Sequence, residues 1–188
     1  VNEILSRVLS MEKLNIQEVV FTGVNLSQYS SIYNDKKFTF SDLLEFLIEN
    51  TKNIKCRISS FYPQHIDEKL CKVLASDRVQ DSFHLSIQSG SENILKQMRR
   101  PYKIDDVYKA IDLLRKAKKN PFISCDLIAG FPGETEEDFN KTVDLCNKVH
   151  FSWIHSFPYS PRPGTFAFSM ADQIPESSDS NDGMFDNL

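Results

Sequence analysis

Apolar residues recur along the 188-residue chain at two different spacings. Spacings of three and four residues are typical of amphipathic helices, and short apolar runs between turn residues are typical of buried strands. The helical spacing covers residues 3–14, 40–48, 66–75, 94–98, 107–114 and 135–149. The strand pattern covers residues 18–22, 55–59, 83–87, 122–129 and 153–157. The polar stretch 28–31 is interpreted as a loop. Strands and helices therefore alternate along the chain.

This alternation predicts an α/β fold with a parallel sheet, because parallel strands need crossover connections. The sequence contains no Asn-Gly pair between apolar runs, which would indicate a hairpin. It also contains no Gly-x-Gly-x-x-Gly sequence, which would indicate a doubly wound nucleotide-binding sheet. Repetition of one strand–helix unit favours a (β/α) barrel, but five units cannot close an eight-stranded one. We therefore expect an open, partial TIM-like barrel over residues 1–175.

Three local motifs specify where elements begin. Thr39 with Asp42, and Thr135 with Asp138, resemble capping boxes at helix starts. Pro132-Gly133 fits the central positions of a type II turn. The turn would direct the chain into the helix that Thr135 caps.

Charge is distributed unevenly along the chain. The net charge of −4 equals that of the four acidic residues in 176–188, which contain no base, so the rest is neutral. This polar, acidic segment is expected to be a disordered tail. Residues 96–119 contain nine Lys or Arg against three Asp. They form either a solvated helix face or a phosphate-facing rim.

No apolar run approaches the roughly 20 residues of a membrane span, and the first residues lack the basic region of a secretory signal. We therefore expect a cytoplasmic protein with no membrane partner. The chain also lacks an initiating methionine, which suggests a fragment or a processed chain.

The four cysteines, Cys56, Cys71, Cys125 and Cys146, have no local metal-binding spacing. Each lies in an apolar periodic segment, so we interpret them as small buried residues in a reducing compartment. No metal ligand is predicted among them.

Polar or small residues follow every predicted strand, and the carboxyl ends of parallel strands share one edge of a sheet. A small-ligand site is therefore expected there. Asp126 lies inside an apolar strand and needs a partner, either an internal arginine or hydroxyl, or a ligand. The four histidines share no spacing, so no nucleophilic triad and no catalytic residue is predicted. Strand-associated aromatics, Phe21, Phe122, Phe151 and Trp153, are interpreted as core.

Five strings in this order closely resemble the tRNA methylthiotransferases, which are radical S-adenosylmethionine enzymes: TGVNLSQY (22–29), RISSFYPQHID (57–67), FHLSIQSGSENILKQMRRPY (83–102), CDLIAGFPGETEEDF (125–139) and FPYSPRPGT (157–165). The likeness extends over residues 1–175. It is strongest to the branch acting on N6-threonylcarbamoyladenosine 37 of tRNA. The isopentenyladenosine and ribosomal-protein branches are less similar and remain open.

The resemblance implies a partial barrel of the radical SAM type, here lacking its first strand. It also implies methylthio transfer to C2 of the modified adenosine, with S-adenosylmethionine and two [4Fe–4S] clusters as cofactors and a tRNA anticodon loop as partner. The cluster-binding cysteines, a further N-terminal domain and an RNA-binding barrel would lie outside this chain. The chain alone is then expected to be inactive, and the reductant is not identified.

The resemblance places the S-adenosylmethionine cradle on three strand ends. Thr22, Gly23 and Val24 match the strand end that receives the methionine amino group. Gln88 and Ser89 match the ribose side. The adenine side is matched by Asp126, Ile128, Gly130 and Phe131, and a basic pair at the substrate rim by Arg99 and Arg100. A noncatalytic module of the same fold, which binds tRNA or a partner through residues 96–119, is the alternative.

Overall fold

The computed structural model describes residues 1–23 and 26–174. Val24 and the predicted acidic tail, residues 176–188, lie outside the described residues. Among the helices of the described part, none has both the length and the apolar character to cross a membrane.

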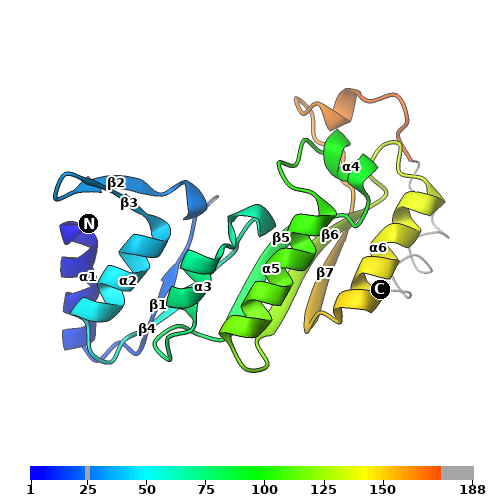
Figure 1. Cartoon of the computed structure of the whole chain (residues 1–188). Coiled ribbons are helices and arrows are strands. Elements are labelled where there is room, and N and C mark those ends of the chain that lie inside the picture. Colours follow the sequence, from blue (N-terminus) through cyan, green and yellow to red (C-terminus); the bar gives the residue numbers. More distant parts are fainter. Residues whose placement is uncertain (24–25, 175–188) are drawn as a thin grey trace.

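Five parallel strands form the central layer of the described chain (Figure 1). They are β1 (Glu18–Phe21), β4 (Lys55–Ile58), β5 (Ser82–Gln88), β6 (Phe122–Ala129) and β7 (Trp153–Pro158). β1 pairs with β4, and β5, β6 and β7 form a continuous sheet. Isolated bridges from Cys56 to Val79 and from Phe61 to Leu85 connect the two groups. The strand order is therefore β1-β4-β5-β6-β7, and the sheet stays open, which confirms the predicted partial barrel.

The helices lie on one face of this sheet, except α4, which lies beyond the carboxyl ends of β5 and β6 (Figure 1). They are α1 (Asn2–Lys13), α2 (Phe40–Asn50), α3 (Glu68–Leu74), α4 (Glu92–Gln97), α5 (Ile104–Ala117) and α6 (Glu136–Val149). Both predicted capping boxes are present, since the Thr39 and Thr135 hydroxyls accept from the backbone of Asp42 and Asp138. Each cap satisfies amide groups that have no partner inside the helix. The helix starts predicted from sequence are thus confirmed.

One part of the predicted topology is wrong. The segment interpreted as a polar loop folds into an antiparallel hairpin of β2 (Ser30–Tyr33) and β3 (Lys36–Thr39). Its two-residue turn consists of Asn34 and Asp35, with φ angles of 50° and 59°. Positive φ at both positions is the requirement of a type I′ turn, and asparagine and aspartate tolerate it. The turn lacks the glycine that the sequence argument sought.

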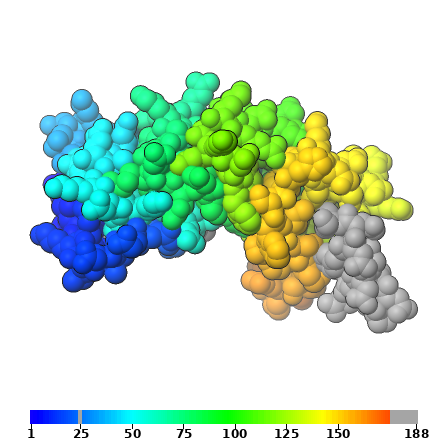
Figure 2. Space-filling model, turned by 90° about the horizontal axis from the view of Figure 1, so that it is seen from below, coloured from blue at the N-terminus to red at the C-terminus, as the bar shows by residue number. Residues whose placement is uncertain are grey.

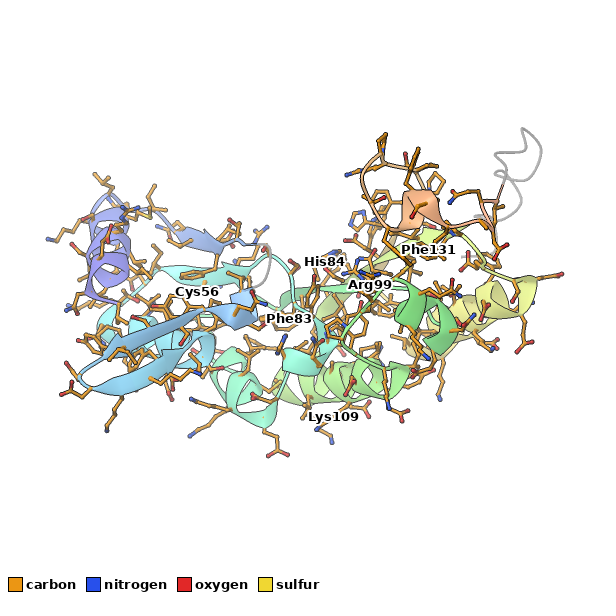
Figure 3. All side chains as sticks on the ribbon, turned by 90° about the horizontal axis from the view of Figure 1, so that it is seen from above. Cys56, Phe83, His84, Arg99, Lys109 and Phe131 are labelled. Atoms are coloured by element: carbon orange, nitrogen blue, oxygen red, sulfur yellow. The ribbon has the colours of Figure 1, made fainter. Side chains whose placement is uncertain are left out.

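Residues alternate between the two faces along each strand. On β5, Phe83, Leu85 and Ile87 are fully buried in the main core cluster. His84 and Ser86 point the other way, because successive side chains of a strand face opposite sides. Figure 3 shows Phe83 on the side of the sheet that carries α5 and His84 on the opposite side.

In residues 1–23 and 26–174, no α-helix covers the opposite face of the sheet, and we call it the open face. Figure 2 shows the outline of the molecule hollowed between the N-terminal end and the segment around residues 155–170. Arg57 of β4 lies on this face and forms an ion pair with Glu18 of β1, at 2.7 Å. Charged groups thus occupy positions that would be apolar in a packed barrel interior.

The cysteines lie in the helix-covered part of the molecule. All four are free and buried, as predicted. Burial raises the pKa of Cys56, Cys71 and Cys146 to about 11, and that of Cys125 further. They are therefore thiols at neutral pH, and their environment differs from that of a reactive cysteine.

Candidate functional site

A pocket of about 630 Å³ opens at the carboxyl ends of β5, β6 and β7. Its lining combines the strand ends with the segment that follows β7, and consists of Gln88, Asp126, Ile128, Phe157, Pro158, Tyr159, Ser160, Arg162, Thr165 and Ala167. The volume falls within the roughly 300–1,000 Å³ of small-molecule sites. Three of the residues predicted for cofactor binding, Gln88, Asp126 and Ile128, meet here.

Gln88 reaches the pocket because β5 is irregular at its end. The pairing with β6 shifts between Ser86 and Gln88, and Gln88 has a φ of 73°. The Tyr102 hydroxyl donates to the carbonyls of Ser86 and Ile87, at 2.6 and 2.8 Å. Burial raises the pKa of Tyr102, so this hydroxyl keeps its proton. Tyr102 thus stabilises the bulge that places Gln88.

Asp126 has a histidine as its partner. His84 Nε2 lies 3.0 Å from Asp126 Oδ2, and His84 Nδ1 lies 2.9 Å from Ser124 Oγ. The carboxylate side chain is 29% exposed. From the sequence, the expected partner was an arginine, a hydroxyl or a ligand, and a histidine was not considered. The structure shows that His84 is that partner.

The segment after β7 forms one wall of the pocket and is held at several points. The Tyr159 amide donates to the Ala129 carbonyl, and the Tyr159 ring packs edge-on against Phe131, 5.4 Å between centroids. Further along, the Arg99 guanidinium lies 4.1 Å above the Phe166 ring. Phe131 and Arg99 therefore support the wall and do not line the pocket.

The loop after β6 begins with Gly130 and has the predicted type II geometry. Gly133 has a φ of 79°, and the Glu134 amide donates to the Phe131 carbonyl at 2.9 Å. The Glu134 carboxylate accepts from the Gly130 amide at 2.6 Å. Burial nevertheless raises the pKa of Glu134. Gly130 therefore acts through its backbone, which anchors Glu134 beneath the loop.

Ser89 is turned away from the pocket. It is fully buried, lies 3.4 Å from the Thr142 hydroxyl and accepts from the Ser91 amide. The adjacent Gly90 approaches α6 so closely that a Cβ atom would lie 2.5 Å from Thr142 Cα. The Ser-Gly-Ser sequence thus packs the strand end against α6.

Thr22 and Gly23 follow β1, two strands away from β5 in the sheet order. Both are exposed, and neither lines the pocket. Parallel pairing places them at the same edge of the sheet as the pocket. The structure therefore brings together Gln88 of the ribose side with Asp126 and Ile128 of the adenine side, and leaves the β1 end apart from them.

The two side chains of the predicted basic pair, Arg99 and Arg100, contact different parts of the molecule. Arg100 turns toward Tyr62 and lines a second pocket of about 490 Å³. The residues around it are Glu92, Asn93, Lys96, Pro101, Tyr102 and Lys103. Three cationic side chains thus border one cavity near the strand-end edge.

The strand aromatics differ from the prediction at two positions. Trp153 is 58% exposed and Phe122 is 47% exposed, so neither is core. On β7, the His155 ring stacks on Phe157, 6.4 Å between centroids, and meets Trp153 edge-on. The register with β6 places these rings on the same face as Asp126, the open face. Alternation along β7 could have indicated the shared face, but not that it is uncovered.

The described residues differ in how they suit the two cofactors implied by the sequence resemblance. No group of three or more histidine, cysteine, aspartate or glutamate side chains in residues 1–23 and 26–174 is arranged to hold a metal ion. These residues do not fit an iron–sulfur cluster. The pocket, by contrast, offers a carboxylate, an amide and apolar walls, which suit an amphipathic nucleoside such as S-adenosylmethionine.

Comparison with known families gives a match to the Radical SAM superfamily over residues 1–146. The solved structure of coproporphyrinogen III oxidase HemN from Escherichia coli, a radical SAM enzyme, is similar at a TM-score of 0.58 and 20% identity, over 72% of this chain and 32% of that one. The radical S-adenosylmethionine methyltransferase TsrM from Kitasatospora setae is similar at a TM-score of 0.62 and 14% identity, over 82% and 28% of the two chains. At these identities the likeness concerns the fold.

Curated relatives are more similar in sequence. The threonylcarbamoyladenosine tRNA methylthiotransferase MtaB of Treponema pallidum is 46% identical over 93% of this chain, and that of Thermotoga maritima is 39% identical over 86%. The tRNA-2-methylthio-N(6)-dimethylallyladenosine synthase of Bdellovibrio bacteriovorus is 35% identical over 94%. The chain spans 36%, 37% and 39% of the lengths of these three relatives.

Proposed function

Because the chain belongs to the Radical SAM superfamily, we propose that it forms the central part of a tRNA methylthiotransferase, with its site at the carboxyl ends of β5, β6 and β7. The observation that carries this proposal is the pocket in which Gln88, Asp126 and Ile128 converge. These residues come from sequence motifs that resemble those of the methylthiotransferases. The proposed reaction is methylthio transfer to C2 of N6-threonylcarbamoyladenosine 37, the substrate branch named in the more similar relatives.

We assign S-adenosylmethionine to this pocket. Asp126 and Gln88 would accept and donate hydrogen bonds at its polar groups, and Ile128 would contact its adenine. When bound, this cofactor supplies the methyl group and the radical-forming sulfonium of the family's chemistry. Gly130 and Phe131 would shape the adenine side through the loop after β6. Thr22, Gly23 and Val24 would bind the methionine end, in the longer protein.

The tRNA would approach along the strand-end edge. Lys96, Arg100 and Lys103 border the second pocket and supply positive charge for backbone phosphates. Arg99 would act indirectly, because it supports the wall at Phe166. The two iron–sulfur clusters would be held by other parts of the longer protein. With tRNA as its substrate, the protein would act in the cytoplasm.

A chimera tests the function directly. Residues 1–175 would replace the matching segment of the Treponema pallidum relative, in a bacterium that lacks its own enzyme of this kind. We expect mass spectrometry of tRNA nucleosides to detect the 2-methylthio form of N6-threonylcarbamoyladenosine. The same chimera carrying Asp126→Asn is the matched control, and we expect it to produce much less.

Two outcomes would contradict the proposal in different ways. If methylthio groups appear on isopentenyladenosine instead, the chain has the substrate specificity named for the Bdellovibrio relative. A chimera that folds and binds tRNA while leaving every adenosine unmodified would favour the noncatalytic module.

A further inference from the structure

His84 lies on the open face beside the pocket, in direct contact with Asp126. We propose that His84 is a positioning residue, which holds one oxygen of the Asp126 carboxylate so that the other is presented to the pocket ligand. This inference rests on the proposed function only for the identity of that ligand. The pair itself stands on the geometry of β5 and β6.

The contact with Asp126 indicates which nitrogen of the ring carries a hydrogen. Asp126 Oδ2 accepts only, so the proton between it and His84 belongs to Nε2, 3.0 Å away. Nδ1 can then accept from the Ser124 hydroxyl at 2.9 Å. A ring with a hydrogen on Nε2 satisfies both contacts at once. Histidines that orient a functional carboxylate or metal use the same division between their two nitrogens.

The pair is held by rigid elements. His84 lies on β5, and both Ser124 and Asp126 lie on β6, which pairs with β5 in parallel register. The His155 ring of β7 approaches the His84 ring edge-on, 5.7 Å between centroids. His84 is thus fixed by contacts from two neighbouring strands. Sites built on strands hold their geometry more accurately than sites built on loops.

A purely structural role explains these contacts less well. The neighbours Phe83 and Leu85 are fully buried and supply the packing of β5, whereas the His84 side chain is 22% exposed. The Asp126 carboxylate lines the pocket and has a second oxygen, Oδ1, with no hydrogen bond to the part of the chain that the structure describes. That oxygen can accept from an amino or hydroxyl group of a ligand. Without His84 the carboxylate would rotate about its side-chain bonds, and the ligand would have to order it.

A double-mutant cycle on the full chain tests this role. The variants are His84→Phe, which keeps the ring shape, Asp126→Asn, and the two combined. Affinity for S-adenosylhomocysteine would be measured by NMR titration, which also detects weak binding. We expect each single variant to bind about tenfold more weakly, the effect of one hydrogen bond to a charged group. The double variant should bind no more weakly than Asp126→Asn, because His84 acts through Asp126.

Two further variants separate positioning from folding. His84→Gln retains an N–H donor on a side chain of similar reach, and we expect it to keep most of the affinity. His150→Asn changes an exposed histidine between α6 and the start of β7, at the opposite end of that strand from the pocket, and should change nothing. Urea midpoints for all variants would show whether any loss of affinity reflects unfolding.

The ligand-free protein provides a readout that does not depend on S-adenosylhomocysteine. Nitrogen-15 NMR of the His84 ring should show the tautomer with hydrogen on Nε2. In Asp126→Asn, this Nε2 hydrogen should exchange faster with solvent. A mobile ring that exchanges between tautomers would overturn the positioning role, as would additive losses in the cycle. If the wild-type chain shows the fixed tautomer and binds no S-adenosylhomocysteine, the ligand assignment under the proposed function fails and the role of His84 toward that ligand fails with it.

Discussion

The two faces of the parallel sheet carry different kinds of side chain. On the covered face, β5 and β6 contribute Phe83, Leu85, Ile123 and Cys125, each at most 2% exposed and packed beneath the helices. On the open face, the alternate positions of the same strands carry polar side chains, among them His84, Ser86, Ser124 and Asp126. A strand with one apolar and one polar face is typical of antiparallel sheets, whereas parallel sheets are usually buried on both sides.

This difference between the two faces indicates which side chains stabilise the fold and which are available to bind a ligand. The covered face supplies most of the apolar burial, which dominates folding free energy. The open face instead has an ion pair from Arg57 to Glu18, the His84–Asp126 pair and exposed rings on β7. We infer that substitutions on the two faces of one strand should affect different properties, stability on one and ligand binding on the other.

The largest expected difference in stability lies between substitutions at two adjacent residues of β5. Leu85→Ala removes a fully buried side chain from the covered face and should lower the free energy of unfolding by about 2–5 kcal/mol. Ser86→Ala, one residue later on the open face, should change it by about 0.5 kcal/mol or less. Urea unfolding followed by circular dichroism measures both. Equal effects would mean that the two faces do not differ in their contribution to stability.

Two aspartates allow the covered and open faces to be compared by removing a charge from each. Asp138 is buried at the start of α6 and accepts hydrogen bonds from the Ser91 and Thr135 hydroxyls, at 2.5 and 2.9 Å. Burial alone would raise its pKa, but these hydrogen bonds lower it overall. Asp138→Asn should cost about 1–3 kcal/mol at pH 7, because charged hydrogen bonds are lost. Asp126→Asn, on the open face, should cost less stability and more ligand affinity.

The sign of the pH dependence follows from the lowered pKa of Asp138. A carboxylate with a lower pKa in the folded state stabilises the fold above the unfolded value, which is about 3.9 for aspartate. This stabilisation is lost as the pH falls through the folded value. Urea unfolding at pH 7, 5 and 3.5 should therefore show a constant gap between the wild type and Asp138→Asn at the two higher pH values and a narrower one at pH 3.5. A gap that stays constant down to pH 3.5 would mean that the charge of Asp138 does not contribute.

The sequence was informative wherever a feature depends on neighbours along the chain. Capping boxes at Thr39 and Thr135, the turn at Gly133 and the period of each helix are local, and all were predicted correctly. The hairpin turn at Asn34-Asp35 is local too. Asparagine and aspartate tolerate its left-handed geometry, but they occur in many other conformations, so the pair does not predict this turn.

The site depended on contacts that no local pattern contains. His84 and Asp126 are 42 positions apart, and they meet only because β5 pairs with β6 in one particular register. A shift of one residue would turn each side chain to the other face. The exposure of Trp153 has the same origin, because the register of β7 with β6 places this residue on the open face. The family resemblance predicts roles for Asp126 and Gln88, but it does not indicate the histidine that contacts the carboxylate.

The smallest expected effect on stability concerns Trp153, at the edge of the open face. It is the one tryptophan of the chain and is 58% exposed, so its fluorescence reports on this face alone. Trp153→Thr keeps a residue that favours strands and should lower the free energy of unfolding by no more than about 1 kcal/mol. In the wild-type protein, acrylamide should quench the native fluorescence nearly as well as it quenches the urea-unfolded chain. Strong protection in the native state would mean that another surface, such as a second copy of the chain, covers β7 in solution. In that case the contrast between a covered and an open face would apply to the single chain only, and Trp153→Thr should then weaken self-association more than folding.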